Sequence, residues 1–386
     1  MLLGVVRLIG IAELLFAFGV LALSLSVALW LAVRGRGAGA RRALMVAALV
    51  PPLHLGAMAL AGAVVRDRTG RTIAAHLCSR SSILHSARMR AEYREEPCRS
   101  ALNRVSGMAF DWSLNPYMGC AHRCAFCYVR GFERRADRPS DERYGSSIRV
   151  KINVADVLRF ELARPSWKRE FVAVGAATDP YQPAEGRYRL TRACLSELAR
   201  ARNPFGVITR GPMIVRDIDV LQEASKRAKV GVSFSVPTLD DDVWRITEPG
   251  TAPPRQRLRA LRMLVDAGIN AAVGMAPLLP GVSDKPEMLE TVVRAARDAG
   301  ATQVWANVLY LAPGTREHFL SVLDRHWPLE SARYRTLYAN RTYLPKSETE
   351  PITRQVVELR SQFGIRDRRR VKLLPPPEPD QLDLAI

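Results

Sequence analysis

Three cysteines stand within eight residues of one another in this chain of 386 residues. They are Cys120, Cys124 and Cys127, and the run from Gly119 to Tyr128 reads GCAHRCAFCY. Three thiolates at this spacing can each hold one iron of a [4Fe–4S] cluster, and no fourth cysteine is near in the sequence. The fourth iron would then be open, which a cluster needs if it is to bind and reduce a small molecule.

A zinc site is the alternative interpretation of the same residues, with His122 or a distant group as the fourth ligand. Structural zinc sites favour paired C-x2-C or H-x3-H spacings, and no second pair of that kind occurs in the chain. The spacing therefore favours the cluster over zinc.

The other cysteines, Cys78, Cys98 and Cys194, are too few for a disulfide scaffold. An accessible cluster suits a reducing compartment, so the sequence predicts a cytoplasmic protein. Lys and Arg exceed Asp and Glu by 57 − 38 = 19, and 50 of the 57 basic residues are arginine. GC-rich codons explain the arginine bias more simply than a partner does. The net charge still favours an anionic partner, nucleic acid above all, because phosphate contacts gain from counterion release.

The N-terminal part has a different texture from the rest. Residues 14–33 carry no charge and are long enough to span a bilayer, and a second apolar stretch at 43–65 is interrupted by Pro51 and Pro52. Two crossings would place the cysteines outside the cytoplasm, where the cluster has no supply of reductant. We therefore interpret residues 1–95 as a mis-assigned or unstructured extension, or else as a membrane anchor through residues 14–33 alone.

From residue 109 onward, short β-rich runs alternate with amphipathic helical patterns. Strands are expected at 112–115, 171–176, 206–209, 230–236, 271–276 and 304–311, and helices at 155–163, 191–202, 217–227, 254–267 and 286–299. Gly268 and Gly300 each follow an Asp-Ala pair, where a helix C-cap belongs. The alternation predicts an α/β fold whose parallel sheet curls into a partial barrel, with the cysteines after its first strand, at the end that carries the chemistry.

This pattern predicts four regions: the apolar and basic extension at 1–95, a core at 100–320, a helical extension at 321–365 and a disordered tail at 366–386. The last six residues, Gln381–Ile386, resemble the short peptide by which bacterial proteins bind the replication sliding clamp. That resemblance implies a sliding clamp as a partner.

The C-x3-C-x2-C spacing, with Phe126 before the third cysteine, resembles the signature of the radical S-adenosylmethionine (SAM) superfamily. The resemblance implies a partial (β/α)6 barrel, a [4Fe–4S] cluster held by Cys120, Cys124 and Cys127, and SAM as the second cofactor. It also implies an external one-electron reductant of the flavodoxin or ferredoxin type. The implied reaction is reductive cleavage of SAM to methionine and a 5′-deoxyadenosyl radical, which takes hydrogen from a substrate.

Four segments narrow the resemblance to the branch related to spore photoproduct lyase, a DNA repair enzyme, over about residues 100–320. They are Asn115–Cys120, Thr178–Tyr181, Glu248–Thr251 and Ala276–Gly281. Two departures argue against reversal of a thymine dimer itself. Phe126 stands where the lyase has a tyrosine, so only Tyr128 matches, and no cysteine lies between Cys127 and Cys194 to donate hydrogen.

The resemblance also implies roles for residues near the cysteines. Phe126 and Tyr128 flank the third ligand and are placed to contact adenine or the cluster, and Tyr128 is the candidate catalytic residue. Thr178 and Asp179 are the nearest substitutes for the Gly-Gly-Glu segment that binds the methionine ammonium in the superfamily and is absent here. Loop packing for the aromatic residues and an ordinary turn for Thr-Asp-Pro are the structural alternatives.

Further candidates lie on later strands. Ser233 and Ser235 alternate on the fourth strand and share one face, which would reach the ribose or carboxylate of SAM if it is inward and a helix if it is outward. Gly274 on the fifth strand allows the backbone to approach adenine. Alternatively, this glycine only serves the backbone geometry where the strand ends. Tyr310 ends the sixth strand, where it could face the substrate.

We therefore expect a radical SAM enzyme, of the lyase or transferase type, that acts on nucleic acid in a reaction related to DNA repair. One alternative is a radical SAM enzyme that modifies a small molecule or a protein. Another is a non-catalytic iron–sulfur protein for electron transfer or sensing. The sequence leaves open the substrate, the hydrogen that is removed, the fate of SAM and the oligomeric state.

Overall fold

The structure is a computed structural model that describes residues 91–369 and 373–374. The apolar segment 14–33, the remainder of residues 1–90, the clamp-like segment 381–386 and most of the expected tail at 366–386 lie outside the described residues. Among the described helices, none combines the length and apolar character that crossing a membrane requires.

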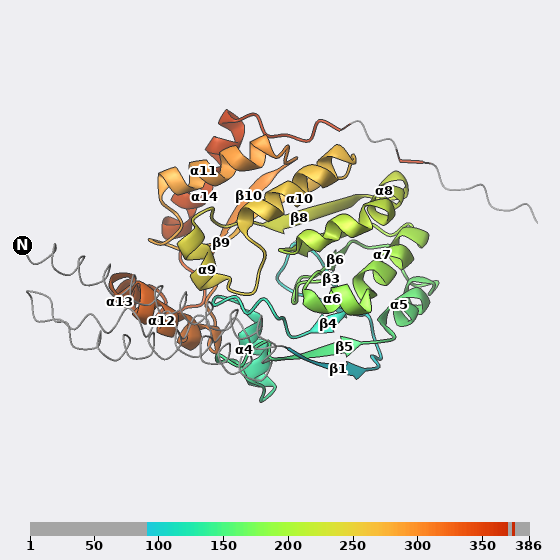
Figure 1. Cartoon of the computed structure of the whole chain (residues 1–386), viewed down its shortest axis with the longest axis horizontal. Coiled ribbons are helices and arrows are strands. Elements are labelled where there is room, and N and C mark those ends of the chain that lie inside the picture. Colours follow the sequence, from blue (N-terminus) through green and yellow to red (C-terminus); the bar gives the residue numbers. More distant parts are fainter. Residues whose placement is uncertain (1–90, 370–372, 375–386) are drawn as a thin grey trace, which may run out of the picture. The chain divides into compact units, whose positions relative to one another are not determined.

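The centre of the described chain is a seven-stranded sheet (Figure 1). Its order is β10 (Val304–Val308), β9 (Ala271–Leu278), β8 (Val230–Ser235), β7 (Phe205–Thr209), β6 (Val172–Val174), β3 (Trp112–Leu114) and β2 (Leu102–Arg104). The strands from β3 to β10 in this sheet are parallel, and β2 runs antiparallel to β3. Within residues 91–369 no pairing joins β2 to β10, so the sheet is the partial barrel that the sequence predicts.

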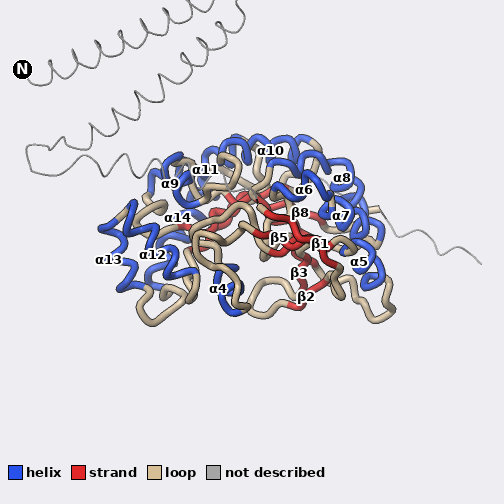
Figure 2. The backbone as a smooth tube through the Cα atoms, turned by 60° about the horizontal axis from the view of Figure 1, so that its bottom comes forward, coloured by secondary structure: helices blue, strands red, loops and turns tan. Residues whose placement is uncertain are grey.

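Helices form an arc outside the sheet (Figure 2). They are α5 (Val154–Leu162), α7 (Leu190–Arg200), α8 (Ile218–Arg227), α10 (Pro254–Asp266), α11 (Pro286–Asp298) and α14 (Lys346–Gln362). Large apolar residues of the strands, such as Val207, Val232 and Phe234, share one core with Leu221 of α8 and Leu261 of α10. Burial of this continuous apolar layer is what holds the helices on the sheet.

The opposite side of the sheet, which we call the inner face, carries small residues on β8 and β9. On β8, Gly231, Ser233 and Ser235 alternate with residues of the helix-side core, and Ala272 and Gly274 do so on β9. Successive residues of a strand point to opposite faces, so these five lie on the inner face. The two serines share one face, as predicted, and of the two orientations left open by the sequence the structure has the inward one.

A second, three-stranded sheet consists of β1 (Glu92–Glu96), β5 (Ser147–Lys151) and β4 (Tyr117–Met118). β1 falls at the end of the range expected for the extension, yet it pairs with β5 along its whole length. β4 directly precedes Gly119, whose φ is +85° and whose missing side chain leaves room for the Ser147 carbonyl. This sheet therefore fixes the start of the cysteine loop.

Every strand and helix expected from residue 109 to residue 300 is present, with ends shifted by a few residues. The sixth expected strand, 304–311, ends earlier, at Val308. Gly268 and Gly300 both have φ of +79° after α10 and α11, as expected of C-caps. The expected helical extension holds the end of α12 (Thr315–His326), α13 (Pro328–Leu337) and α14. The four domain boundaries remain predictions.

Candidate active site

The cysteine loop, residues 119–128, lies between β4 and α4 (Val129–Arg135). Cys120 and Cys124 are buried, Cys127 is half-buried, and all three are free thiols. Cys127 Sγ lies 3.3 Å from the hydroxyl of Tyr144, a buried residue that packs against Cys120. Within the described residues, no three His, Cys, Asp or Glu side chains converge on a single metal ion. A [4Fe–4S] cluster does not need such convergence, because each cysteine binds a different iron.

Burial raises the pKa of the Cys124 and Cys127 thiols, because a buried thiolate loses its solvation. Two neighbours oppose this effect: the Arg210 guanidinium lowers the pKa of Cys124, and the Tyr144 hydrogen bond lowers that of Cys127. Iron binds the thiolate form of cysteine. Bound iron would stabilise the negative charge of these buried thiolates, as water does for exposed ones. Three cysteines that form no disulfide, lie largely buried and have cations nearby are therefore suitable ligands for an iron–sulfur cluster.

Hydrogen bonds to its backbone hold the loop from two sides. The side chain of Gln182, which is fully buried, donates from Nε2 to the Gly119 carbonyl over 3.1 Å and accepts from the Ala121 N–H over 3.0 Å. From the other side, Ala125 N–H donates to the carbonyl of Thr247, at the end of α9 (Asp241–Thr247). The loop is thus held on both sides of Cys120 and directly after Cys124.

Gly250 packs closely against this loop. Its N–H donates to the His122 carbonyl over 3.0 Å, and a Cβ at this position would lie 2.4 Å from the Ala121 carbonyl oxygen. Only glycine leaves room for that approach. Farther along the chain, Thr315 Oγ1 donates to the carbonyl of Cys127 over 3.0 Å. The first residue of α12 therefore also contacts the third cysteine.

Arg130 is a buried cation beside the loop. Its guanidinium donates to four backbone carbonyls, including that of Cys124, and lies 4.6 Å from the centre of the Tyr144 ring. Since these hydrogen bonds go to carbonyls rather than to carboxylates, they leave its positive charge unneutralised. That charge favours thiolates, and an anionic cluster, at the cysteines.

Ion pairs at the carboxyl ends of β6, β7 and β8 form what we call the cysteine-side network, which contains Asp179, His122, Arg210, Glu248 and Arg257. Asp179 is its hub: it accepts from Thr209 Oγ1 and the Arg210 N–H, and it lies 3.3 Å from His122 Nδ1. Burial would raise the pKa of Asp179, but His122 and these hydrogen bonds lower it to about 2. Asp179 therefore joins the cysteine loop to β7.

Glu248 is the second buried carboxylate of this network and pairs with two arginines. One oxygen accepts from Arg210 Nε, and the other lies 3.0 Å from Nη1 of Arg257, which is fully buried. Arg210 also donates to the Ala276 carbonyl over 3.1 Å and lies 5.7 Å from the Phe126 ring centre. The network thus connects the loop with β7, β9 and α10.

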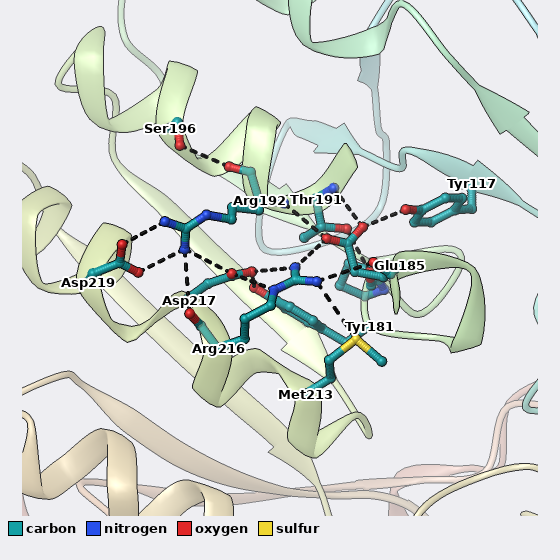
Figure 3. Close-up of polar contacts among 11 residues, drawn as sticks. Tyr117, Tyr181, Glu185, Thr191, Arg192, Ser196, Met213, Arg216, Asp217 and Asp219 are labelled. Atoms are coloured by element: carbon teal, nitrogen blue, oxygen red, sulfur yellow. Dashed lines mark hydrogen bonds and ion pairs between the residues drawn. The ribbon is translucent and has the colours of Figure 1, made fainter. Parts of the chain in front are cut away.

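A second network lies among α6 (Pro183–Tyr188), α7, the 3-10 helix Pro212–Asp217 and α8 (Figure 3). This helix-side network contains Tyr117, Tyr181, Glu185, Thr191, Arg192, Arg216, Asp217 and Asp219. Tyr117 of β4 donates to Glu185, which also accepts from the Thr191 N–H and from Arg216. Glu185 therefore anchors β4, the strand before the cysteines, to the helix layer.

The candidate residues near the loop do come together. Phe126 is buried under Arg210, and the Tyr128 hydroxyl donates to the Ala176 carbonyl. Thr178 donates to the Tyr117 carbonyl, and Asp179 has the partners given above. Each of these four thus has a structural contact, and their roles toward SAM remain predictions. Ser233, Ser235 and Gly274 lie on the inner face.

Sequence reasoning missed several residues that hold the loop, namely Arg130, Tyr144, Gln182, Arg210 and Arg257, while Glu248 entered only within a matching segment. In a chain with 50 arginines, no local signal separates a buried arginine from an exposed one. Gln182 directly follows the Thr-Asp-Pro-Tyr run, which was the available signal that this turn faces the cysteines.

Solved structures share this fold. A structure of spore photoproduct lyase complexed with dinucleoside spore photoproduct aligns with a TM-score of 0.55 at 13% identity, covering 73% of this chain and 82% of that one. A mutant of the same lyase aligns with a TM-score of 0.55 at 14% identity, covering 78% of this chain and 85% of that one. At these identities the likeness concerns the fold.

Relatives with higher identity are uncharacterized proteins. One from Mycobacterium tuberculosis is 37% identical over 297 residues, which is 76% of this chain and 86% of the relative. One from Acidianus two-tailed virus is 29% identical over 224 residues, which is 55% of this chain and 71% of the relative. The model of the radical SAM superfamily matches residues 114–292, which hold all three loop cysteines and the cysteine-side network. The chain belongs to the radical SAM superfamily, and it is an enzyme of that type with SAM and a [4Fe–4S] cluster as its cofactors.

Proposed function

We propose that this enzyme uses a [4Fe–4S] cluster held by Cys120, Cys124 and Cys127 to cleave SAM reductively, and that its substrate is nucleic acid. The observation that carries the first part is the buried cysteine loop, held at the carboxyl ends of the parallel strands with cations beside it. Chemistry in barrels of parallel strands collects at that end.

When bound, the cluster and SAM supply the one-electron cleavage and the 5′-deoxyadenosyl radical. The residues of the chain hold these groups and shield them. Gln182 and Gly250 fix the backbone of the loop, and Arg130 and Arg210 provide positive charge next to the thiolates. Phe126, buried with the Arg210 guanidinium over its ring, excludes water from that side.

The net charge of +19 supports nucleic acid as the substrate, since a basic protein gains affinity for phosphates by counterion release. The fold shared with a lyase solved in complex with a dinucleoside spore photoproduct agrees with this choice. Reversal of a thymine dimer by the same relay is not part of the proposal. Phe126 lacks a hydroxyl, and Cys194 is buried in the helix-side core.

Two partners belong to the same proposal. An external one-electron donor of the flavodoxin or ferredoxin type would reduce the cluster, and Gln381–Ile386 would dock on a sliding clamp. A pull-down with purified clamp, compared with a chain that ends at residue 380, tests the second partner.

Anaerobic reconstitution with iron, sulfide, dithionite and SAM tests the chemistry. We expect visible absorbance from the cluster and formation of 5′-deoxyadenosine, and the Cys124→Ala variant should lose both. Cys194→Ala is the matched control, because Cys194 is a residue of α7 in the helix-side core and its replacement should not affect either readout. Stoichiometric zinc in place of iron, or a cluster without SAM cleavage, would overturn this part.

Binding to DNA over a salt series tests the substrate class. A protein that neutralises several phosphates loses affinity steeply with salt, with a log–log slope of about −0.9 per phosphate contact on duplex DNA. We also expect DNA to accelerate the formation of 5′-deoxyadenosine. A product rate that DNA leaves unchanged, together with absent or salt-insensitive binding, would instead favour a small molecule or a protein as substrate.

A further inference from the structure

Trp305 is a large aromatic residue on the inner face of the sheet. Its neighbours in β10, Val304 and Ala306, pack into the helix-side core, so Trp305 points the other way. Its side chain is only partly covered by the described residues: Trp305 is 37% exposed. The indole Nε1–H donates to Ser233 Oγ over 3.3 Å, which fixes one edge of the ring.

Gly274 explains how the indole fits on the sheet. It is the register partner of Trp305 in the neighbouring strand β9, and a Cβ on Gly274 would lie 2.6 Å from Cζ2 of the indole. Real Cβ atoms do not approach another atom that closely, so the ring occupies the space that the missing side chain leaves. The indole is therefore held by a hydrogen bond on one side and by bare backbone on another.

The register places Trp305 at the level of the candidate site. Thr209, the last residue of β7, pairs with Phe234, which in turn pairs with Val273. The next row along the sheet contains Ser235, Gly274 and Trp305. Arg210, which follows Thr209, donates to the carbonyl of Ala276 in the same strand β9. The cysteine-side network therefore reaches β9 two residues beyond the glycine under the indole.

We propose that Trp305 is a stacking platform for a base of the nucleic-acid substrate, an inference that rests on the proposed function. Enzymes that act on a base take it out of its stack and hold it on an aromatic ring, and such stacking tolerates any base because each has a π-face. The neighbouring inner-face residues Gly231, Ala272 and Gly274 are small and leave the ring without bulky competitors.

A base of the substrate is favoured over the adenine of SAM by the position of β10. Within the described sheet β10 is an edge strand, whereas the cysteines follow β3, which lies near the other edge of the same sheet. Trp305 on this strand is partly exposed, so a polymer can reach it from solvent. The excess of 19 positive charges complements the phosphates that such a polymer brings with its bases.

The test compares a short single-stranded oligothymidylate with an abasic oligomer of the same length, because the pair differs in bases and not in phosphates. Trp305→Leu should weaken binding of the oligothymidylate about 5- to 150-fold, the range measured for loss of one stacking residue, and should leave binding of the abasic oligomer unchanged. Trp305→Phe, which keeps an aromatic face, should retain most of the affinity. Gly274→Ala, which displaces the indole without changing it, should behave like Trp305→Leu.

Phe160→Leu is the matched control, since it removes an exposed aromatic ring from α5 on the helix side. Thermal unfolding of each variant shows whether it is folded. If wild type does not bind the oligothymidylate at all, the proposed substrate class fails and this inference with it. If wild type binds and Trp305→Leu binds equally well, only the inference fails. Weaker SAM binding by Trp305→Leu, measured by calorimetry with unchanged affinity for the oligomer, would assign the ring to SAM and overturn the proposal.

Discussion

The helix-side and cysteine-side networks use the same kinds of residues and have opposite charge balances. In the helix-side network three carboxylates face two arginines, and the carboxylates of Glu185 and Asp217 are fully buried. In the cysteine-side network two carboxylates face two arginines and His122. Burial opposes the charge on His122, but Cys120 and Asp179 raise its pKa to about 10, so this network carries excess positive charge.

The difference indicates what each network is for. The helix-side network connects consecutive helices with β4 and is complete within itself. The cysteine-side network connects loops from different strands, and its excess charge, added to that of Arg130, complements thiolates and the anionic groups they would hold. One network stabilises the fold, whereas the other prepares a binding site.

The largest effect should come from removing the shared carboxylate of the cysteine-side network. Glu248→Gln leaves two arginines without their partner, one of them fully buried, and should lower the free energy of unfolding by about 3–5 kcal/mol. Asp219→Asn at the exposed edge of the helix-side network should cost less than about 1 kcal/mol. Chemical denaturation measures both, and equal losses would contradict the comparison.

The next effect concerns the close approach at the cysteine loop. Gly250→Ala forces the loop backbone to move and should cost about 1–3 kcal/mol, with less iron bound per chain after reconstitution. The control is Gly186→Ala in α6, where the nearest atom would be 3.5 Å from the new Cβ, so stability should stay the same or rise. Full iron binding by Gly250→Ala would show that the approach is not needed.

Gln182→Ala should act on the loop alone. It removes two hydrogen bonds to loop backbone and leaves buried polar groups unsatisfied, a loss of about 1–3 kcal/mol, and iron content after reconstitution should fall with it. Gln222→Ala removes an exposed glutamine that bonds the Ala267 carbonyl and should change neither quantity. Iron titration distinguishes the two variants. Identical titration curves would show that the two Gln182 hydrogen bonds are not needed to hold the cysteine loop.

The smallest effect should come from Tyr117→Phe in the helix-side network. Loss of one hydrogen bond to Glu185, which keeps its other partners, should cost about 1 kcal/mol. Since we assign the helix-side network to fold stability and not to cluster binding, the reconstituted variant should keep the wild-type absorbance and 5′-deoxyadenosine yield. A loss of cluster in this variant would merge the two networks into one functional unit.

The fold could be predicted where the sequence pattern is local. The six parallel strands and the helices between them follow from periodicity, and Gly268 and Gly300 end their helices as expected. The small sheet was missed because β1 reads Glu-Tyr-Arg-Glu-Glu, which has no apolar alternation. Its pairing with β5 is a tertiary effect that propensity does not encode.

The site could be predicted at the cysteines and only in part around them. The spacing of the thiols is local, but Gln182 and Arg130 act through burial and through contacts with distant backbone groups. Asp179 was expected to bind a ligand. The structure gives it His122 and Thr209 as partners, which the sequence did not reveal, and its role toward SAM remains a prediction. Which polar residue is buried depends on the completed fold, so a single sequence does not reveal it.

The hydrogen bond from Thr315 to the Cys127 carbonyl joins residues 188 positions apart. Contacts of such long range form late, because a large stretch of chain must first be closed into a loop. We therefore expect iron and sulfide to enter only after the ribosome has made most of the protein. A nascent chain stalled before α12 would lack this anchor, and its thiols would remain open to oxidation.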